Sequence, residues 1–326
     1  MYQPSQASNV NQQAGTEQNV QIGVWGGTGC GKTTYLAALQ IASLHEPGNW
    51  LIRGLDHLYP GSIRFLGQST ISLNKDLEFP VASSTQQQYG YNIVGTPVND
   101  TWRRIANRLS GKQEDLSFTL NVLDQPGGDY LNTDYENNLW RFLAECDGII
   151  YLYDPTIEQQ GMTNWEYLTM SLGYAALAVQ RSQRGNRLES GRMPQFLAVC
   201  MVKYDDPLIF KELLRENLIV VDATGKRAVP RVTDPRRAFD LKTDGLSGDL
   251  LRSYFIPERV RYFATSSIGF YTTDPQRIDL TDCYNVDGMA PSGQAIRGPI
   301  HPVDVFAPLI WLAQSAIQLR MQRGGR

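Results

Sequence analysis

The chain has 326 residues, of which 42% are hydrophobic and 19% charged, and its formal net charge is -3. This near-neutral balance excludes a general electrostatic attraction to nucleic acid or to an anionic membrane. Its longest clean apolar run, residues 196–202, is much shorter than the roughly 20 residues that cross a bilayer, so no membrane span is expected. The four cysteines form no CxxC pair, which argues against a disulfide framework or a zinc site and favours a cytoplasmic location.

Both ends of the chain are predicted to be tails. Residues 1–19 are rich in Gln, Asn and Ser and carry a single charge, so they bury too little apolar surface to offset the entropy of ordering. They also lack the basic start and apolar stretch of a signal peptide. Residues 321–326 are expected to form a flexible C-terminal tail, which leaves residues 20–320 as the folded domain.

Short apolar runs alternate with helical patterns along this domain. The strand-like runs are residues 20–25, 116–123, 148–153, 196–202 and 260–265. The helical patterns are residues 33–44, 163–181 and 303–319. Fully apolar strands that are separated by helices are typical of a mostly parallel sheet covered on both faces. We therefore predict a three-layer α/β fold.

Three stretches depart from this alternation and are interpreted as insertions into the one domain. Residues 45–115 are rich in Gly, Pro, Ser, Thr and Gln and have weak periodicity. Residues 218–257 contain a hairpin-like segment followed by a helical pattern, and residues 270–302 read as a Pro- and Gly-rich loop. Connections of this length are usually functional or flexible.

The first strand and the first helix are joined by a P-loop, because the segment between them matches GxxxxGK[ST] at every fixed position. The matching residues, to which we add Thr34 as a nucleotide contact, are Gly26, Gly27, Thr28, Gly29, Cys30, Gly31, Lys32 and Thr33. In such a loop, glycines allow backbone N–H groups to point at phosphate oxygens, and the helix N-terminus adds a partial positive charge. The lysine would reach the β- and γ-phosphates and the Thr33 hydroxyl would bind Mg²⁺. The sequence therefore predicts a P-loop NTPase fold that binds a nucleoside triphosphate.

Three later strands also end in polar residues. The second apolar strand ends at Asp124, and Gly127 follows three residues later. The run 196–202 is followed by Lys203 and Asp205, and the last run by Ser266 and Ser267. Because α/β proteins bind ligands at the carboxyl ends of their strands, we expect these residues to meet around the nucleotide.

In this order the motifs resemble those of the Ras-like P-loop GTPases. The resemblance implies that Asp124 holds Mg²⁺, that the Gly127 N–H meets the γ-phosphate, and that Asp205 accepts two hydrogen bonds from guanine. It also implies that Lys203 packs over the base and that Ser266 and Ser267 approach it from the other side. The expected function is a Mg²⁺-dependent switch that binds GTP and GDP in preference to ATP.

The sequence departs from this family at two points. Val202 precedes Lys203 at the position where the guanine-recognition motif of the family, [NT]KxD, has Asn or Thr. Gly128 stands where many members have the glutamine that orients the attacking water. Gln125 lies three residues too early to replace that glutamine. We therefore expect slow or partner-dependent hydrolysis. The magnesium-binding threonine of switch I is placed at Thr85, with Thr70 and Thr96 as alternatives.

Two other interpretations stay open at this point. One is a non-hydrolysing P-loop module that serves as an assembly scaffold, and the other is an ATP-specific NTPase. The long insertions and the helical pattern near residue 311 also resemble bacterial double-GTPase-type proteins of conflict and effector systems. That resemblance implies a regulatory role and a partner GTPase or a von Willebrand-like partner. We also expect a protein effector, and the near-neutral charge argues against a nucleic-acid partner.

Overall fold

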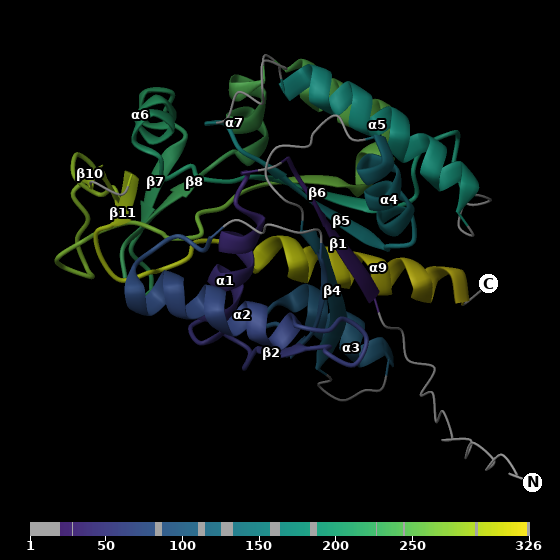
Figure 1. The fold of residues 1–326 in the computed structure, drawn as a ribbon, viewed down its shortest axis with the longest axis horizontal. Coiled ribbons are helices and arrows are strands. Elements are labelled where there is room, and N and C mark those ends of the chain that lie inside the picture. The colour runs from purple at the N-terminus through teal and green to yellow at the C-terminus, as the bar shows by residue number, and fades with distance from the viewer. Residues whose placement is uncertain are drawn as a thin grey trace, which may run out of the picture.

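A seven-stranded sheet forms the centre of the structure, which is a computed structural model (Figure 1), with the strand order β2-β3-β4-β1-β5-β6-β9. Its strands are β1 (Val20–Trp25), β2 (Leu51–Gly54), β3 (Gln87–Gly95), β4 (Leu116–Asp124), β5 (Gly148–Tyr153), β6 (Phe196–Met201) and β9 (Val260–Ala264). Strand β1 is parallel to β4 and β5, β5 to β6, and β6 to β9, whereas β3 is antiparallel to both β2 and β4. The predicted α/β class with a mostly parallel sheet is confirmed. The structure describes residues 20–27, 29–81, 87–109, 115–124, 133–156, 164–182, 188–225, 227–243, 245–290 and 293–324.

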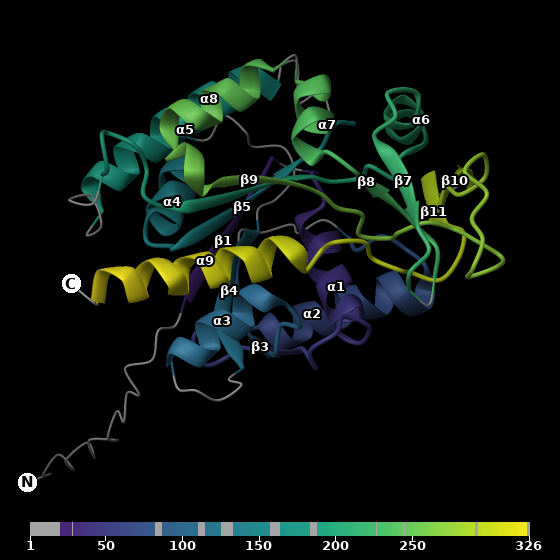
Figure 2. The ribbon, with the colours of Figure 1, turned by 180° about the vertical axis from the view of Figure 1, so that it is seen from behind.

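Helices cover both faces of the sheet, as Figures 1 and 2 show from opposite sides. One face carries α1 (Lys32–Ser43), α2 (Ser62–Ile71), α3 (Asp100–Leu109) and α9 (Ala307–Gly324). The other face carries α4 (Thr133–Ala144), α5 (Asn164–Arg181), α7 (Pro235–Lys242) and α8 (Leu246–Tyr254). The remaining helix, α6 (Pro207–Arg215), follows β6 at one end of the molecule.

The two faces have separate hydrophobic cores, and neighbouring residues of β1 belong to different ones. Val24 packs in the core under α1 and α9, whereas Trp25 packs in the core under α4 and α5. The reason is that successive side chains of a strand point to opposite faces of the sheet. The Trp25 ring stacks on Tyr151 with centroids 4.1 Å apart and meets Trp140 edge-on at 4.9 Å. This packing fixes the strand from which the P-loop starts.

The three stretches interpreted as insertions contain regular structure. Residues 45–115 supply β2 and β3 to the central sheet, together with α2 and α3. The sequence did not indicate this, because β3 pairs over its whole length with β4 but lies in a segment of mixed polarity. The other two stretches contain hairpins outside the main sheet. These hairpins are β7 (Ile219–Asp222) with β8 (Val229–Val232), and β10 (Val286–Ala290) with β11 (Gly293–Ile296). The limits of the domain itself stay a prediction.

The last helix starts later and ends later than the pattern predicted. It runs from Ala307 to Gly324, so residues expected to form the C-terminal tail are helical up to that point. Arg320 binds Asp147 at 2.7 Å, and Arg323 binds Glu189. These ion pairs tie the end of α9 to the body of the protein. The expected tail of residues 1–19 lies outside the described residues.

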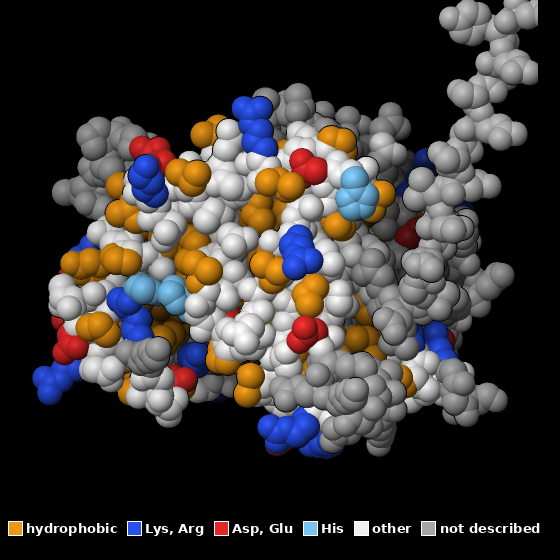
Figure 3. Space-filling view, turned by 90° about the horizontal axis from the view of Figure 1, so that it is seen from below, with side chains coloured by type: hydrophobic (Ala, Val, Ile, Leu, Met, Phe, Trp, Pro, Cys, Tyr) orange, Lys and Arg blue, Asp and Glu red, His pale blue; other side chains and the backbone are white. Residues whose placement is uncertain are grey.

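The surface on the side of α2 is mixed in character. Figure 3 shows that face with hydrophobic side chains scattered between widely separated charged ones. Leu58 and Ile63, which are 62% and 60% exposed, belong to this part of the chain. Among the described residues, no helix is both long enough and apolar enough to cross a membrane.

Candidate nucleotide-binding site

The loop between β1 and α1 has the backbone shape of a phosphate cradle. Gly29 and Gly31 have φ angles of 76° and 88°, which lie in the left-handed region that glycine adopts without steric cost. Gly31 is the N-cap of α1 and offers no side chain to the first N–H groups of the helix. A helix N-terminus without a capping side chain leaves these donors and the positive end of the helix dipole for an anion.

Lys32 is folded over this loop. Its side chain is buried, with 8% exposed, and its Nζ donates to the carbonyl oxygens of Gly26 at 2.9 Å and Gly27 at 3.0 Å. The ammonium group therefore sits at the centre of the cradle, where a phosphate would be bound. Two threonines follow Lys32 in the first turn of α1. Thr33 is half-buried, and Thr34 lines the cavity that is described below. The predicted contact Thr28 lies outside the described residues.

Lys203 joins the P-loop to the neighbouring strands. It follows β6 with a φ angle of 54°, and its Nζ lies 2.5 Å from Asp154 Oδ2 and 3.4 Å from the carbonyl oxygen of Gly29. Oδ1 of Asp154 accepts hydrogen bonds from the backbone N–H and the hydroxyl of Thr156, at 2.8 and 2.7 Å. Sequence reasoning did not assign Asp154 or Thr156 to the site. The available signal was the position of Asp154 directly after a fully apolar strand.

Asp205 is a buried carboxylate without a complete set of partners. Its side chain is 6% exposed, and its Oδ1 has no hydrogen-bond partner in the structure. Burial raises the pKa of Asp205 to about 6, although a hydrogen bond from the Ser266 side chain opposes the rise. A buried acceptor left without a donor costs about 1–3 kcal/mol, so its presence is best explained by a ligand that supplies the donor.

The two predicted serines have different roles. Ser266 is fully buried, and its hydroxyl accepts a hydrogen bond from the Gly269 N–H at 2.8 Å, which shapes the loop after β9. Ser267 lines the cavity itself. Of these two, Ser267 is therefore the one placed to contact a ligand directly.

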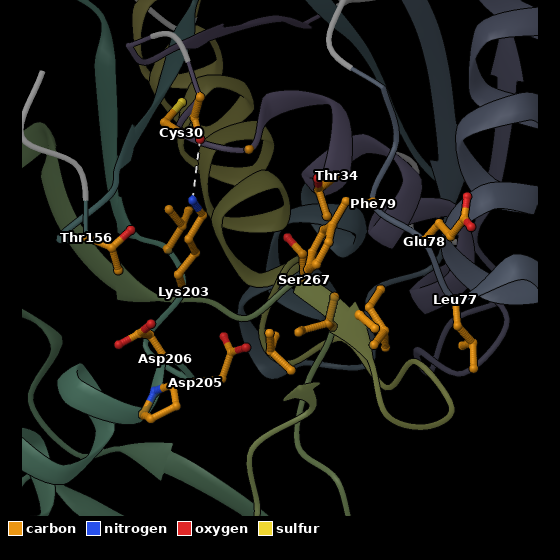
Figure 4. A pocket seen from close by; sticks show the side chains of 18 of the residues that line it. Cys30, Thr34, Leu77, Glu78, Phe79, Thr156, Lys203, Asp205, Asp206 and Ser267 are labelled. Carbon is orange, nitrogen blue, oxygen red and sulfur yellow. Dashed lines mark hydrogen bonds between the residues drawn. The ribbon is translucent and has the colours of Figure 1, made fainter. Parts of the chain in front are cut away.

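These elements surround one cavity of about 960 Å³. Figure 4 shows Lys203 reaching toward the P-loop, with Asp205 and Asp206 below it, and Glu78 and Leu77 on the far side. The P-loop contributes Gly29, Cys30 and Gly31 to the lining, and Val202 lines the cavity at the position where the base motif departs from its usual form. The volume falls within the range of ordinary small-molecule sites.

The remaining predicted residues fall at the margin of the described part of the chain. Asp124 ends β4, and the register that pairs Val24 with Val122 brings its backbone level with Gly26. Nothing is described of the Asp124 side chain. Gln125, Gly127, Gly128 and Thr85 lie outside the described residues.

Of the four cysteines, Cys30 is the one that lines the cavity. All four are buried, and none of them forms a disulfide. Cys30 lies inside the P-loop, where burial raises its thiol pKa, so that the neutral thiol packs against the loop.

The scan against protein-family models found no match, and neither did the search of curated proteins. Among solved structures, 148 chains match. The S. cerevisiae Ski7 GTPase-like domain, bound to GTP, has 13% identity and a TM-score of 0.34, over 92% of this chain and 50% of that one. Sup35 complexed with GDP has 11% identity and a TM-score of 0.32, and the match covers 85% of this chain and 44% of that one. The signal recognition particle receptor SRb-GTP/SRX complex from Chaetomium thermophilum has 14% identity and a TM-score of 0.37, over 78% and 93%. This chain spans about half the length of the first two. All three TM-scores are low, so the interpretation of the site depends on the geometry of this chain alone.

Proposed function

We propose that this protein is a GTP-binding, Mg²⁺-dependent molecular switch with slow or partner-dependent hydrolysis. The observation that carries the proposal is that the P-loop and the segment Lys203–Asp205, which we call the KxD segment, line the same cavity, with Gly29 and Gly31 at one end and Lys203 and Asp205 nearby. The two motifs are about 170 residues apart in the chain, and their meeting at one cavity is expected if they bind two parts of one ligand.

The charges of the cavity also match the two ends of a nucleotide. The P-loop end carries Lys32 and the N-terminus of α1, which attract phosphates. Away from the P-loop the cavity is lined by the carboxylates of Asp76, Glu78, Asp205 and Asp206, which repel phosphates. A triphosphate is therefore expected at the P-loop and the base at the carboxylate end.

The identity of the base follows from Asp205. Guanine presents two adjacent donors, N1–H and the exocyclic amine, whereas adenine has no such pair of donors at that edge. The Asp205 carboxylate is buried and has a free Oδ1, so it fits a donor-rich edge and favours guanine over adenine. Val202 supplies no polar contact beside it.

Thr33 and Asp124 would hold the magnesium ion of the nucleotide. The fit is supported by the position of Thr33 in the first turn of α1 and of the Asp124 backbone level with the start of the P-loop. Hydroxyl and carboxylate oxygens are the ligands that Mg²⁺ prefers, and the ion would neutralise phosphate charge. A protein effector or partner GTPase in the cytoplasm would then bind the protein according to whether it holds GTP or GDP.

Nucleotide competition tests the proposal. Labelled GTP is bound with Mg²⁺ and challenged with unlabelled GTP, GDP or ATP, for the wild type, Lys32→Ala and Asp205→Asn. We expect GTP and GDP to compete at least 100-fold better than ATP, Lys32→Ala to abolish binding, and Asp205→Asn to remove the preference for guanine. Equal competition by ATP with no effect of Asp205→Asn would show that the KxD segment does not read the base.

A further inference from the structure

The wall of the cavity that faces the P-loop is built from two segments that are more than 200 residues apart. One is the stretch from Asp76 to Phe79, which follows α2, and the other is the β10–β11 hairpin, which contributes Val286, Ala295 and Ile296. Figures 1 and 2 show this hairpin at the same end of the molecule as α6, next to the far end of α2. Neither segment carries a motif that the proposed function has used.

The two segments touch at one defined point. The backbone N–H of Ile296 donates to the carbonyl oxygen of Leu77 at 3.4 Å, which is long compared with the usual 2.9–3.0 Å. The Ile296 side chain is 5% exposed, and Leu77 and Phe79 pack against the same hydrophobic core. The contact therefore combines a weak hydrogen bond with apolar burial, a combination that can open without unfolding the sheet.

The Leu77 side of this contact has an unusual backbone. Residues Ser72–Asp76 form a π-helical turn, and Leu77 follows with a φ angle of 56°. A π-helical turn is rare, and a leucine in the left-handed region costs on the order of 1 kcal/mol or more. The Leu77 and Glu78 N–H groups both turn back to the Ser72 carbonyl oxygen. In this conformation the Leu77 carbonyl accepts the hydrogen bond from Ile296 of β11.

We propose that the Leu77–Ile296 contact retains the bound nucleotide, and that opening this contact limits the rate of nucleotide release. The inference rests on the proposed function, and it concerns the exchange step rather than the identity of the ligand. The contact lies on the cavity wall that faces the P-loop, so a nucleotide held by the P-loop and Asp205 would lie against Leu77 and Ile296, and separating these two residues would widen its route out. A switch with this wall would exchange nucleotide slowly unless a partner opened it.

The test measures the release of fluorescently labelled GDP in the presence of Mg²⁺ and excess unlabelled GDP. Leu77→Gly removes the side chain but keeps the left-handed backbone, and Ile296→Ala removes most of the apolar contact. Each variant has a matched control outside the cavity. Ser190→Gly changes an exposed residue with a φ of 54°, and Ile317→Ala truncates an isoleucine of the same core that is 4% exposed.

We expect both cavity variants to release GDP about tenfold faster, with a smaller change in association, because changes at one binding surface act mainly on dissociation. The double variant should be no faster than the faster single one, since both act on one contact. Both controls should stay within about twofold of the wild type. Thermal unfolding of each variant confirms that it is folded, and Leu77→Gly is the safer variant because glycine accepts its backbone conformation.

Two results would overturn the inference in different ways. If labelled nucleotide binds, Lys32→Ala abolishes binding and the cavity variants release GDP at the rates of their controls, then the contact does not retain the nucleotide and only this inference fails. If the wild type binds no guanine nucleotide, the proposed function fails and the inference fails with it.

Discussion

The ammonium nitrogen of Lys203 lies 2.5 Å from Oδ2 of Asp154, and this ion pair links the ends of two neighbouring strands, β5 and β6. The Asp154 side chain is fully buried, whereas that of Lys203 is 41% exposed. The same ammonium group reaches the Gly29 carbonyl of the P-loop at 3.4 Å. One lysine therefore compensates a buried charge and connects the base-recognition segment to the phosphate-binding loop.

Removal of this lysine should destabilise the protein even without nucleotide. Lys203→Met keeps the apolar stem but leaves Asp154 as an unpaired buried carboxylate, and we expect it to lower the free energy of unfolding by about 1–2 kcal/mol. This is less than the 3–5 kcal/mol of a fully buried pair, because water reaches the lysine. Denaturant unfolding measures the change. Adding Asp154→Asn to Lys203→Met should restore part of the loss; if it restores none, the ion pair is not the source of the effect.

The sequence predicted those parts of the fold whose signal is local. The strands at residues 20–25 and 148–153 have the predicted bounds because both are short and mainly apolar, and the P-loop was placed by its fixed glycines and lysine. Strand β3 was missed because its support comes from pairing with β4 rather than from its own pattern. When a segment mixes polar and apolar residues, its own sequence does not show which strand it pairs with.

The candidate site shows the same limit. The motifs placed Lys32, Lys203 and Asp205 at one sheet edge. The structure brings Lys203 and Asp205 to one cavity with Gly29 and Gly31 of the P-loop, while Lys32 is folded over the loop itself. The role of Asp154 depends on a contact with a residue 49 positions later, and the far wall depends on a contact between Leu77 and Ile296. No rule of sequence spacing predicts such pairs, so the sequence offered a signal for Asp154, its place after an apolar strand, but none for the partner that it contacts.

Gly26 should tolerate no side chain. The reason is the lack of space for a Cβ and not a left-handed backbone conformation. A Cβ on Gly26 would lie 2.9 Å from the backbone oxygen of Leu152 and 2.7 Å from Cys30 Sγ. We expect Gly26→Ala to displace the P-loop and weaken GTP binding by at least tenfold, measured by titration with labelled nucleotide. Gly67→Ala in α2 is the matched control, because its Cβ would meet nothing within 4 Å. That variant should bind normally and gain about 0.5–1 kcal/mol of stability. Normal binding by Gly26→Ala would mean that the loop can relax around the clash.

Asp205 should reduce the stability of the nucleotide-free protein at neutral pH. Its pKa is about 6 in the folded protein, above the ordinary 3.8, so the folded state binds more protons than the unfolded state between these values. The free energy of unfolding therefore falls as the pH rises from about 4 to about 6, and the full penalty is present above pH 6. We expect Asp205→Asn to stabilise the free protein by about 1–3 kcal/mol at pH 7 and to have little effect near pH 4. Thermal unfolding across this pH range checks the prediction, and an equal effect at both pH values would contradict it.

The affinity for guanine nucleotide should depend on the same titration, with the opposite sign. Only the ionised Asp205 carboxylate can accept both donors of the guanine edge, and the fraction ionised falls as the pH drops below about 6. We expect the affinity for GDP to fall about tenfold for each pH unit below 6, because binding to the ionised form must then displace a proton. The measurement is a titration of labelled GDP between pH 5 and pH 8. Asp205→Asn serves as the reference, since its weaker binding keeps any pH dependence that comes from the phosphates but loses the part that comes from residue 205. Identical pH profiles for the two proteins would place the base elsewhere in the cavity, away from Asp205.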